Sequence, residues 1–386
     1  MDKSVVLAGA VRTTVSRRNG GWSAVHPARL LGAAQRAVLD RTGIDPALIG
    51  QVIGGTVTQV GEQSFNLART AWLAEGLPQQ VAASTVDAQC GSSQQAFTLA
   101  TALVGAGLAD VALACGVESM TRIPIGANFG KQLGLGRPVP KAYQRHYEFL
   151  NQFKSAERIA ERYGITRDRA DAFGLTSQQR AAAAWAQGRF DGQVVTGPAE
   201  TEDGDAAEVA RDEGLRQTSA DQLAELKPVL PDGIHTAGTS SQISDGASAV
   251  LLATEQSAAS LGLTPLARVV DSLLVGVDPV LMLLGPHAAV PALLERNRLT
   301  LDDIAVIEIN EAFASVVLSF ADELKADPAT INPNGGAIAL GHPLGATGCV
   351  LLTKAVHELA RTQARYALVT MCCGGGLGTA TLLERL

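Results

Sequence analysis

The residues best suited to chemistry in this chain are cysteines and a histidine that stand beside glycines. The first group is Asp87-Ala88-Gln89-Cys90-Gly91-Ser92-Ser93, between an extended run and a predicted helix start. Gly91 permits a tight turn, and backbone amides at the start of a helix stabilise an anion. We therefore expect Cys90 to have a lowered pKa and to act as a nucleophile. On this segment alone, a buried structural cysteine is the alternative.

The second group surrounds His342, which lies between Gly341 and Gly345 in a loop that begins at Asn334. Histidine can take a proton from a thiol near neutral pH, and glycines allow close backbone approach. A structural histidine is the alternative, but glycines on both sides disfavour it. No Lys followed by Ser or Thr comes after these glycines, so the loop is not a P-loop for phosphate.

The third group, Cys372-Cys373-Gly374-Gly375-Gly376, closes an apolar predicted strand. Three successive glycines expose backbone amides that could bind a developing oxyanion. Adjacent strand residues point to opposite faces, so only one of the two cysteines can face a given site. Packing at a strand end is the alternative, and it leaves the triple glycine unexplained.

A fourth segment, Asn310-Glu311-Ala312-Phe313, follows the apolar run 304–309. Asn310 could cap a helix over 311–323, which is the simpler interpretation. Its side-chain amide could equally orient a catalytic water.

The elements that must position these residues alternate between strand-like and helix-like patterns. This alternation predicts α/β layers with mainly parallel strands. In the first third of the chain we expect strands at 5–8, 52–60, 81–88 and 110–115, and helices at 27–41, 66–74 and 94–104. From about 121 to 238 the pattern becomes more charged and contains two predicted helices, 155–163 and 167–187, with apolar faces. This stretch is an excursion from the α/β core, whose pattern resumes after Ile243.

A weak internal repeat links the two halves of the chain. The Cys90 turn leads into a helix and then a buried strand at 111–116, and the turn at 341–345 leads into a helix that ends near Ala360 and a strand at 367–372. Both strands end in Cys and Gly. In open α/β sheets, sites lie beyond the carboxyl ends of strands, where these turns are expected.

Composition limits the classes of function. The 386 residues, 46% of them hydrophobic, can form about two or three domains. A net charge of −7 argues against nucleic-acid binding but leaves an anionic substrate open where Lys and Arg cluster. Five cysteines without a Cys-x-x-Cys pair or a zinc pattern predict reduced thiols and no metal site. The N-terminus lacks a signal-peptide core and no run is long enough to span a membrane, so we expect a cytoplasmic protein.

Together, these segments resemble the thiolase family over essentially the whole chain. The matching elements are the Cys90 turn, the box at Asn310, the Gly-His-Pro loop at His342 and the Cys372-x-Gly-Gly-Gly terminus. Weaker matches are 236–238 with 245–247, and Gly285-Pro286. The resemblance implies a duplicated five-layer α/β/α/β/α fold with an inserted loop domain. Its N-terminal half would comprise 1–121 plus 243–264, its CoA-binding loop domain 122–242, and its C-terminal half 265–386.

The resemblance also implies reversible CoA-dependent cleavage of a 3-ketoacyl-CoA to acyl-CoA and acetyl-CoA, or the reverse Claisen condensation. Cys90, deprotonated with help from His342, would carry the acyl group, and Cys372 would be the acid and base for the second carbon centre. His342 and a water fixed by Asn310 would hold the enolate oxygen. The backbone amides of Cys90 and Gly374 would hold the acyl carbonyl. A free thiol pKa of about 8.5 makes a cysteine base plausible without extreme tuning.

The same resemblance suggests residues that contact the substrate. Ser241 matches a serine that contacts the pantetheine arm of CoA, and Arg216 matches a basic residue near the adenine nucleotide. Met282 matches a methionine of the substrate pocket. Phe313, in the segment that begins at Asn310, is also expected to contact the substrate. CoA and acyl-CoA would be substrates, with no permanently bound cofactor, no metal, no nucleic acid and no membrane. A homodimer or homotetramer acting in fatty acid or lipid metabolism is expected.

Several positions depart from short-chain biosynthetic thiolases, which often have His-Met where this chain has Asn151-Gln152. The other departures are Phe153, Thr239, Gln242, Ser244, Leu283 and Leu284. We interpret these changes as reshaping the acyl pocket without touching the chemical groups. They put acetoacetyl-CoA specificity in doubt, and similar patterns occur among thiolases that act on bulkier acyl chains.

Two other functions are compatible with parts of the pattern. Ketoacyl synthases share the duplicated fold and a nucleophilic cysteine, but they use two histidines and decarboxylate malonyl thioesters, whereas this chain offers Asn310 and Cys372. A non-enzymatic CoA- or acyl-binding protein would be expected to have lost the Cys or the His, and both are present here.

Overall fold

The computed structural model describes residues 4–130, 134–198, 200–201, 203–205 and 207–386. Its strands are β1 (Val5–Thr13), β2 (Ser16–Arg17), β3 (Gln51–Gly55), β4 (Ala82–Val86), β5 (Val111–Ser119), β6 (Val194–Val195), β7 (Ser244–Thr254), β8 (Ala267–Gly276), β9 (Val306–Ile309), β10 (Tyr366–Cys373) and β11 (Leu377–Arg385). Its α-helices are α1 (Pro27–Thr42), α2 (Leu67–Ala74), α3 (Ser92–Gly105), α4 (Gln152–Arg162), α5 (Arg167–Ala186), α6 (Ala220–Ala224), α7 (Glu255–Ser260), α8 (Gly285–Asn297), α9 (Ala314–Leu324), α10 (Ala337–Leu340) and α11 (Thr347–Thr362).

The strands form two similar sheets that meet along one short seam. Their order is β4-β3-β5-β7-β1-β8-β11-β10-β9, and β1 pairs with β8 only through Val6 with Arg268 and Leu7 with Ala267. In the first sheet β4, β3 and β5 are parallel, and β7 and then β1 follow antiparallel. In the second, β9 and β10 are parallel, and β11 and β8 follow antiparallel. The two halves therefore repeat one topology.

The expectation of mainly parallel strands was wrong. Six of the ten strand pairings within the described residues are antiparallel. One cause is the hairpin at Gly374–Gly376, which joins β10 directly to β11 without a crossover helix. The other is β7, which returns from the excursion and pairs antiparallel on both of its sides.

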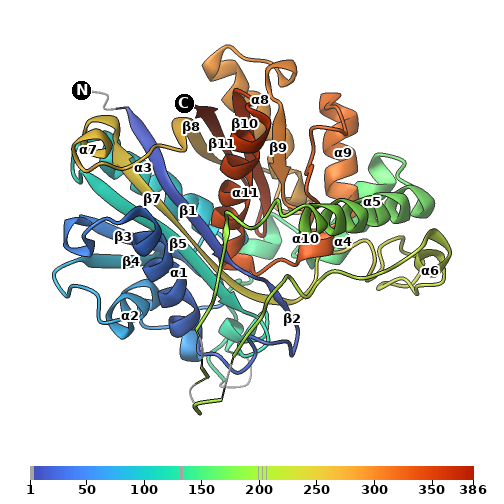
Figure 1. The fold of residues 1–386 in the computed structure, drawn as a ribbon. Coiled ribbons are helices and arrows are strands. Elements are labelled where there is room, and N and C mark those ends of the chain that lie inside the picture. Colours follow the sequence, from blue (N-terminus) through green and yellow to red (C-terminus); the bar gives the residue numbers. More distant parts are fainter. Residues whose placement is uncertain (1–3, 131–133, 199, 202, 206) are drawn as a thin grey trace.

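Two helices, α3 and α11, are packed between the sheets (Figure 1). Both are buried over much of their length, and twelve of the sixteen residues of α11 are buried. A helix that is apolar on nearly all sides must lie in a core. On the outer faces, α1 and α2 cover the first sheet and α8 and α9 cover the second. The result is five layers, α/β/α/β/α, with the N-terminal ends of both central helices in the middle of the molecule.

The excursion packs against the second half of the chain, where α4 and α5 lie against α9 and α5 lies against α10. Asn151 begins this packing because its side chain accepts the backbone N–H of Lys154 at 2.9 Å and caps α4. A buried ion pair between Arg12 of β1 and Asp212 (2.8 Å) anchors the excursion to the first sheet. The predicted strand 52–60 ends at Gly55, because the amides of the next residues bind a buried carboxylate instead of a strand.

Candidate active site

The turn that carries Cys90 is held by local hydrogen bonds at the start of α3. Ser92 donates its hydroxyl to the carbonyl of Gln89 (2.6 Å) and accepts the N–H of Ala88 (3.0 Å). Gln89 has φ 54, a left-handed conformation that is rare outside glycine and is often found at functional turns. A Cβ added at Gly91 would lie 2.7 Å from the sulfur of Cys373, so only glycine fits there.

The pKa of Cys90 is not lowered as the sequence suggested. Burial raises it to about 11, and the nearby charge of Glu118 acts in the same direction. Hydrogen bonds from the backbone N–H of Gly374 and the side chain of Gln152 oppose this effect. The expectation rested on the amides of the helix N-terminus alone, but this N-terminus lies in a core where desolvation of the thiolate dominates.

Cys372 and Cys373 face opposite sides of β10, as their positions on the strand require. Cys372 belongs to an apolar cluster that includes Met282 and Phe313, whereas Cys373 packs into the layer of α3 beside Gly91. Both thiols are close enough for a Cys90 thiolate to raise their pKa, although burial is the larger cause. Cys372 therefore does not have the ordinary thiol pKa that the sequence led us to expect.

His342 is held in one tautomer by its neighbours. Its Nδ1 lies 2.6 Å from Oγ1 of Thr347, and that hydroxyl donates its own proton to the carbonyl of Pro343 at 2.8 Å. The hydroxyl must therefore accept from Nδ1–H, which leaves the lone pair on Nε2. Nε2 lies 3.3 Å from Nδ2 of Asn310, and burial lowers the pKa of His342 to about 3. The resting histidine is a neutral base.

Asn310 does not cap a helix. Helix α9 begins at Ala314 with Phe313 at the capping position, and Asn310 lies in the connection from β9, where its backbone N–H donates to Thr370 at 3.2 Å. Its Oδ1 is buried and has no hydrogen-bond partner within the described residues. A buried polar atom without a partner is costly, which favours a role in binding a ligand oxygen or a water.

Two buried carboxylates, which sequence analysis missed, hold the loop around His342. Glu118 of β5 accepts the N–H groups of Val57 (2.9 Å), Thr58 (3.0 Å) and Gly345 (2.9 Å). The signal was present in the sequence, because an acidic residue inside an apolar strand needs several donors.

Glu311 plays the same part on the other side of the loop. It accepts from Ser177 (2.6 Å), Asn332 (2.8 Å) and the N–H of Ile338 (3.1 Å), and so fixes the segment before His342. The sequence signal for this role of Glu311 was its position directly after Asn310, a candidate site residue.

The departures from short-chain thiolases do not leave the chemical groups untouched. Ser244 accepts the backbone N–H of His342 at 3.1 Å, and Gln242 donates to the carbonyl of Ile338 at 2.9 Å. These two side chains support the histidine loop, which corrects the interpretation that they only reshape a pocket. Phe153, in contrast, lies against Phe313, with ring centroids 4.9 Å apart, in the apolar cluster that contains Cys372 and Met282.

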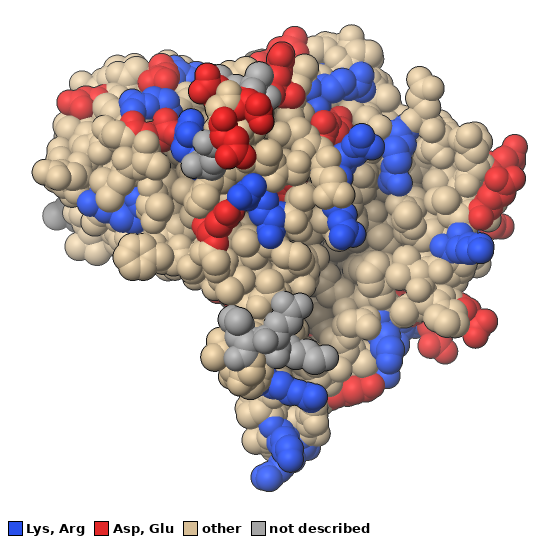
Figure 2. Space-filling view, turned by 90° about the horizontal axis from the view of Figure 1, so that it is seen from below, with Lys and Arg blue, Asp and Glu red and all other residues tan. Residues whose placement is uncertain are grey.

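The predicted CoA contacts lie along one segment. Arg216 donates to the carbonyl of Ala237 (3.1 Å) and lines a hollow of about 430 Å³ with Gln178 and Gly238. The backbone N–H of partly exposed Ser241 donates to Ala312 at 3.0 Å, beside Phe313. On the face in Figure 2, Lys and Arg mix with Asp and Glu, and basic side chains stand near a hollow. That face has no continuous basic field of the kind nucleic acids need.

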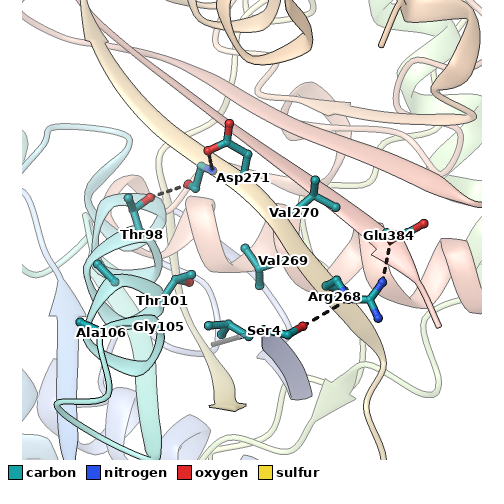
Figure 3. A pocket seen from close by; sticks show the side chains of 13 residues that line it. Ser4, Thr98, Thr101, Gly105, Ala106, Arg268, Val269, Val270, Asp271 and Glu384 are labelled. Carbon is teal, nitrogen blue, oxygen red and sulfur yellow. Dashed lines mark hydrogen bonds and ion pairs between the residues drawn. The ribbon is translucent and has the colours of Figure 1, made fainter. Parts of the chain in front are cut away.

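A larger cleft of about 940 Å³ lies away from these residues, between α3 and β8 (Figure 3). Thr98 and Ser272 are hydrogen-bonded at 2.6 Å on its wall, and Arg268 pairs with Glu384 at 2.9 Å. Because residues of the C-terminal half of α3 line the cleft, it lies at the opposite end of that helix from Cys90.

Within the ranges described above, no group of three His, Cys, Asp or Glu residues is placed to hold a metal ion. No helix among them is long and apolar enough to cross a membrane.

Comparison with known proteins gives one consistent result. The N-terminal domain of the thiolase family matches residues 5–256 and its C-terminal domain matches 263–385. The steroid 3-ketoacyl-CoA thiolase of Mycobacterium tuberculosis is 46% identical over 383 residues, covering 98% of this chain and 93% of that protein. The 3-oxoadipyl-CoA/3-oxo-5,6-dehydrosuberyl-CoA thiolase of Escherichia coli is 40% identical over all of both chains. Human mitochondrial 3-ketoacyl-CoA thiolase has a TM-score of 0.90 at 34% identity and covers 100% of this chain and 99% of its own.

Proposed function

Because this chain belongs to the thiolase family and is an acyltransferase, we propose that it cleaves a 3-ketoacyl-CoA by CoA-dependent thiolysis, or runs the reverse condensation, through an acyl-enzyme on Cys90. The observation that carries this proposal is the grouping around one buried sulfur, because the backbone of Gly374 lowers the pKa of Cys90 and the charge of Cys90 raises the pKa of Cys372. A nucleophile, an oxyanion donor and a second acid–base group are thus supplied together.

In the first half-reaction, the thiol proton of Cys90 passes to Nε2 of His342 and the sulfur bonds to the 3-oxo carbon of the substrate. The bond between C2 and C3 then breaks, and Cys372 gives its proton to C2 of the departing acetyl-CoA enolate. His342, now protonated on both nitrogens, can donate to the enolate oxygen. Asn310 supports this role because its amide lies beside Nε2 and its Oδ1 is free for a water.

In the second half-reaction, CoA enters as a thiol and gives its proton to the thiolate of Cys372. Its sulfur attacks the acyl carbon held on Cys90, whose carbonyl oxygen lies at the N–H groups of Cys90 and Gly374. The tetrahedral intermediate expels the sulfur of Cys90, which recovers its proton from His342. The raised pKa of Cys90 and the lowered pKa of His342 support proton transfer only while substrate is bound, because the free ion pair is disfavoured in this buried setting.

For CoA itself we propose the region 122–242 as the binding domain, with Ser241 at the pantetheine arm and Arg216 at the nucleotide. The hollow beside Arg216 and the partly exposed position of Ser241 support this assignment. Met282 and Phe313 would border the acyl chain, since both pack with Cys372. CoA and its thioesters would be substrates, with no permanently bound cofactor.

For the acyl group we propose a chain bulkier than acetoacetyl. Phe153 and Phe313 form an aromatic wall, and the relative named above with 46% identity is a steroid 3-ketoacyl-CoA thiolase. The test is thiolysis of 3-ketoacyl-CoAs of graded length and bulk, with the mass of the protein measured before CoA is added. We expect a mass increase equal to the acyl group that is absent in Cys90→Ser. No acylation by any 3-ketoacyl-CoA would contradict the proposal.

A decarboxylating condensing enzyme is not favoured. Every relative named above is a thiolase, and this chain offers Asn310 and Cys372 where ketoacyl synthases use two histidines. Release of CO₂ from malonyl-CoA without thiolysis would be its signature.

We also propose a cytoplasmic homo-oligomer. Five free cysteines are consistent with a reducing compartment.

Strand β4 pairs only with β3 among the described strands, and beside it Phe65 is 93% exposed. Asn66 anchors Phe65 to β4 through the carbonyl of Ala83 at 2.9 Å. An open strand edge next to an exposed aromatic residue is suited to a second copy. Phe65→Asp should lower the mass measured by light scattering, whereas an unchanged mass would place the interface elsewhere.

A further inference from the structure

A buried histidine, His235, lies against the aromatic wall of the apolar cluster and outside the groups proposed for the chemistry. Its side chain is inaccessible to solvent, and both of its ring nitrogens have hydrogen-bond partners. Nδ1 lies 2.9 Å from the carboxylate of Glu157 in α4, and Nε2 lies 2.9 Å from the hydroxyl of Ser315 in α9. The imidazole therefore joins the excursion to the helix that follows the Asn310 segment.

The carboxylate of Glu157 fixes His235 through three hydrogen bonds. It accepts the backbone N–H groups of Ile234 (2.9 Å) and His235 (3.0 Å) as well as the ring nitrogen. Burial alone would raise the pKa of Glu157, but the hydrogen bonds from these two residues lower it below its usual value, so the group is ionised. Because a carboxylate can only accept, Nδ1 must carry a proton. The resulting charge-assisted bond holds the ring more firmly than a neutral bond would.

The ring of Phe313 contacts both the imidazole and Phe153. Its centroid lies 5.4 Å from that of His235, with an angle of 81° between the rings, and 4.9 Å from that of Phe153, with an angle of 75°. Both contacts are edge-to-face, a geometry that aromatic rings prefer. Phe313 is itself buried in the cluster that contains Cys372 and Met282. Its position beside the proposed acyl pocket thus depends on two rings, of which only the imidazole is held by hydrogen bonds.

The backbone of Phe313 pairs with the segment that follows His235. Ser241 donates its N–H to Ala312 at 3.0 Å, and Ser240 and Phe313 form an antiparallel bridge. Ser241 is the residue proposed to contact the pantetheine arm. His235 therefore lies at the start of a segment that reaches both proposed parts of the substrate, the pantetheine arm and the acyl group.

We propose that His235 is a specificity-determining positioning residue, which holds Phe313 as a wall of the acyl pocket through its hydrogen bonds to Glu157 and Ser315. This inference rests on the proposed function and deepens it. A bulky acyl group gains contact with a wall that is already ordered, so it does not have to order that wall as it binds. An acetyl group is too small to gain as much. The preference for a bulky acyl group therefore depends on polar contacts that lie outside the pocket.

The experiment compares thiolysis of benzoylacetyl-CoA, whose transferred acyl group is an aromatic ring, with thiolysis of acetoacetyl-CoA. The variant His235→Leu removes both hydrogen bonds of the ring and keeps an apolar side chain against Phe313. We expect kcat/KM to fall by about tenfold for benzoylacetyl-CoA and by no more than about twofold for acetoacetyl-CoA, because the contacts of an apolar pocket discriminate by factors of this size. The loss should appear mainly in KM, since the wall contacts the substrate before and during the reaction.

Two further variants separate the hydrogen bonds from simple packing. His235→Asn is the rescue variant, because its amide can take the place of Nδ1–H and donate to Glu157, and it should recover part of the preference for benzoylacetyl-CoA. Glu157→Gln removes the charge that holds the imidazole and should change the preference in the same direction as His235→Leu. Glu295→Gln is the matched control, since it makes the same change at an exposed position of α8 and should leave both substrates unaffected.

The position of the Phe313 ring is measured without activity by ¹⁹F NMR of protein that contains 4-fluorophenylalanine, with its signal assigned from Phe313→Leu. In Glu157→Gln the imidazole still contacts Phe313, so a shifted or broadened signal reports the loss of its anchor. An unchanged signal, or an equal loss of kcat/KM for both thioesters in His235→Leu, would overturn the proposal. Failure of the wild type to be acylated by either thioester would instead contradict the thiolase mechanism, and the ¹⁹F signal would still decide the role of His235.

Discussion

The hydroxyl of Thr347 lies 2.6 Å from Nδ1 of His342 and donates to the carbonyl of Pro343 at 2.8 Å. Its single proton is committed to the carbonyl, so it can only accept from the imidazole. This leaves the lone pair of His342 on Nε2, toward Asn310. The tautomer of the proposed base is therefore set by a residue five positions along the chain, across the turn that starts α11.

Replacing Thr347 with Val should impair the base without removing it. The β-branched shape is kept, but Nδ1–H loses its acceptor, and the histidine can adopt the tautomer whose Nε2 carries a proton and cannot accept one. We expect kcat to fall by about tenfold or more, with a smaller change in KM, because general-base catalysis is typically worth at least that much. The pH profile of kcat and the ¹⁵N shifts of His342 are the measurements.

Thr347→Ser is the rescue control, since it restores the acceptor. It should recover most of kcat and the Nδ1–H signature. A Val variant with normal kcat and an unchanged tautomer would show that Thr347 only packs.

The cysteines of the site should separate into two chemical steps. Cys90→Ser should prevent acyl-enzyme formation by an acyl-CoA, whereas Cys372→Ala should still be acylated from an acyl-CoA but should fail to make or break the carbon–carbon bond. Cys373→Ala should retain both steps, because Cys373 faces the layer of α3. Intact-protein mass reports acylation, and thiolysis or condensation assays report the second step.

A normal Cys372→Ala enzyme together with an inactive Cys373→Ala enzyme would reverse the assignment. Equal loss of acylation in both variants would point to damage of the turn at Gly91 instead.

The sequence predicted those features of the site that depend on neighbouring residues, and it did not predict those that depend on burial or on contacts between distant segments. Cys90, His342 and Cys372 were recognisable because reactive side chains stood beside glycines, a local signal. The five layers followed from the resemblance and are confirmed by the fold. The direction of the pKa shift at Cys90 could not be obtained, since it depends on burial between two sheets rather than on the helix start.

The contacts that hold the site together connect residues far apart in sequence. Glu118 reaches Gly345 across 227 positions, and Glu311 reaches Ser177 across 134 positions. Helix capping stayed the simpler alternative for Asn310 from the residues alone, because the sequence does not reveal that α9 starts four residues later. The antiparallel pairing of β7 with β5 and of β11 with β10 could not be predicted either, because an alternation of strands and helices does not reveal the direction of each strand.

The reactivity of Cys90 in the free enzyme should be low at neutral pH and should rise steeply with pH. With a pKa of about 11, roughly one thiol in ten thousand is ionised at pH 7, compared with a few per cent for an ordinary cysteine. Alkylation of Cys90 should increase by about tenfold for each pH unit until the pKa is approached, because only the thiolate reacts. Peptide mass analysis separates Cys90 from the other thiols. A plateau below pH 8 would show that the site lowers the pKa after all.

The buried pair of Lys354 and Glu308 should stabilise the loop before His342. Lys354 donates to Glu308 at 2.6 Å and to the carbonyl of Gly335 at 2.6 Å, and both side chains are fully buried. Lys354→Met leaves a buried carboxylate without its partner. We expect a loss of about 3–5 kcal/mol in the free energy of unfolding, measured by urea denaturation at pH 7.5.

The dependence of this loss on pH distinguishes charge from packing. Burial raises the pKa of Glu308 to about 7 even with Lys354 present, so the folded protein binds more protons than the unfolded chain between about pH 4.5 and 7, and its stability falls as pH rises through that window. Lys354 lowers this pKa, so its removal must raise it and extend the fall to higher pH. Lys354→Met should therefore be least harmful near pH 5, and adding Glu308→Gln should recover much of the loss at pH 7.5. A loss that is the same at both pH values, and that Glu308→Gln does not repair, would show that the methylene packing of Lys354 matters rather than its charge.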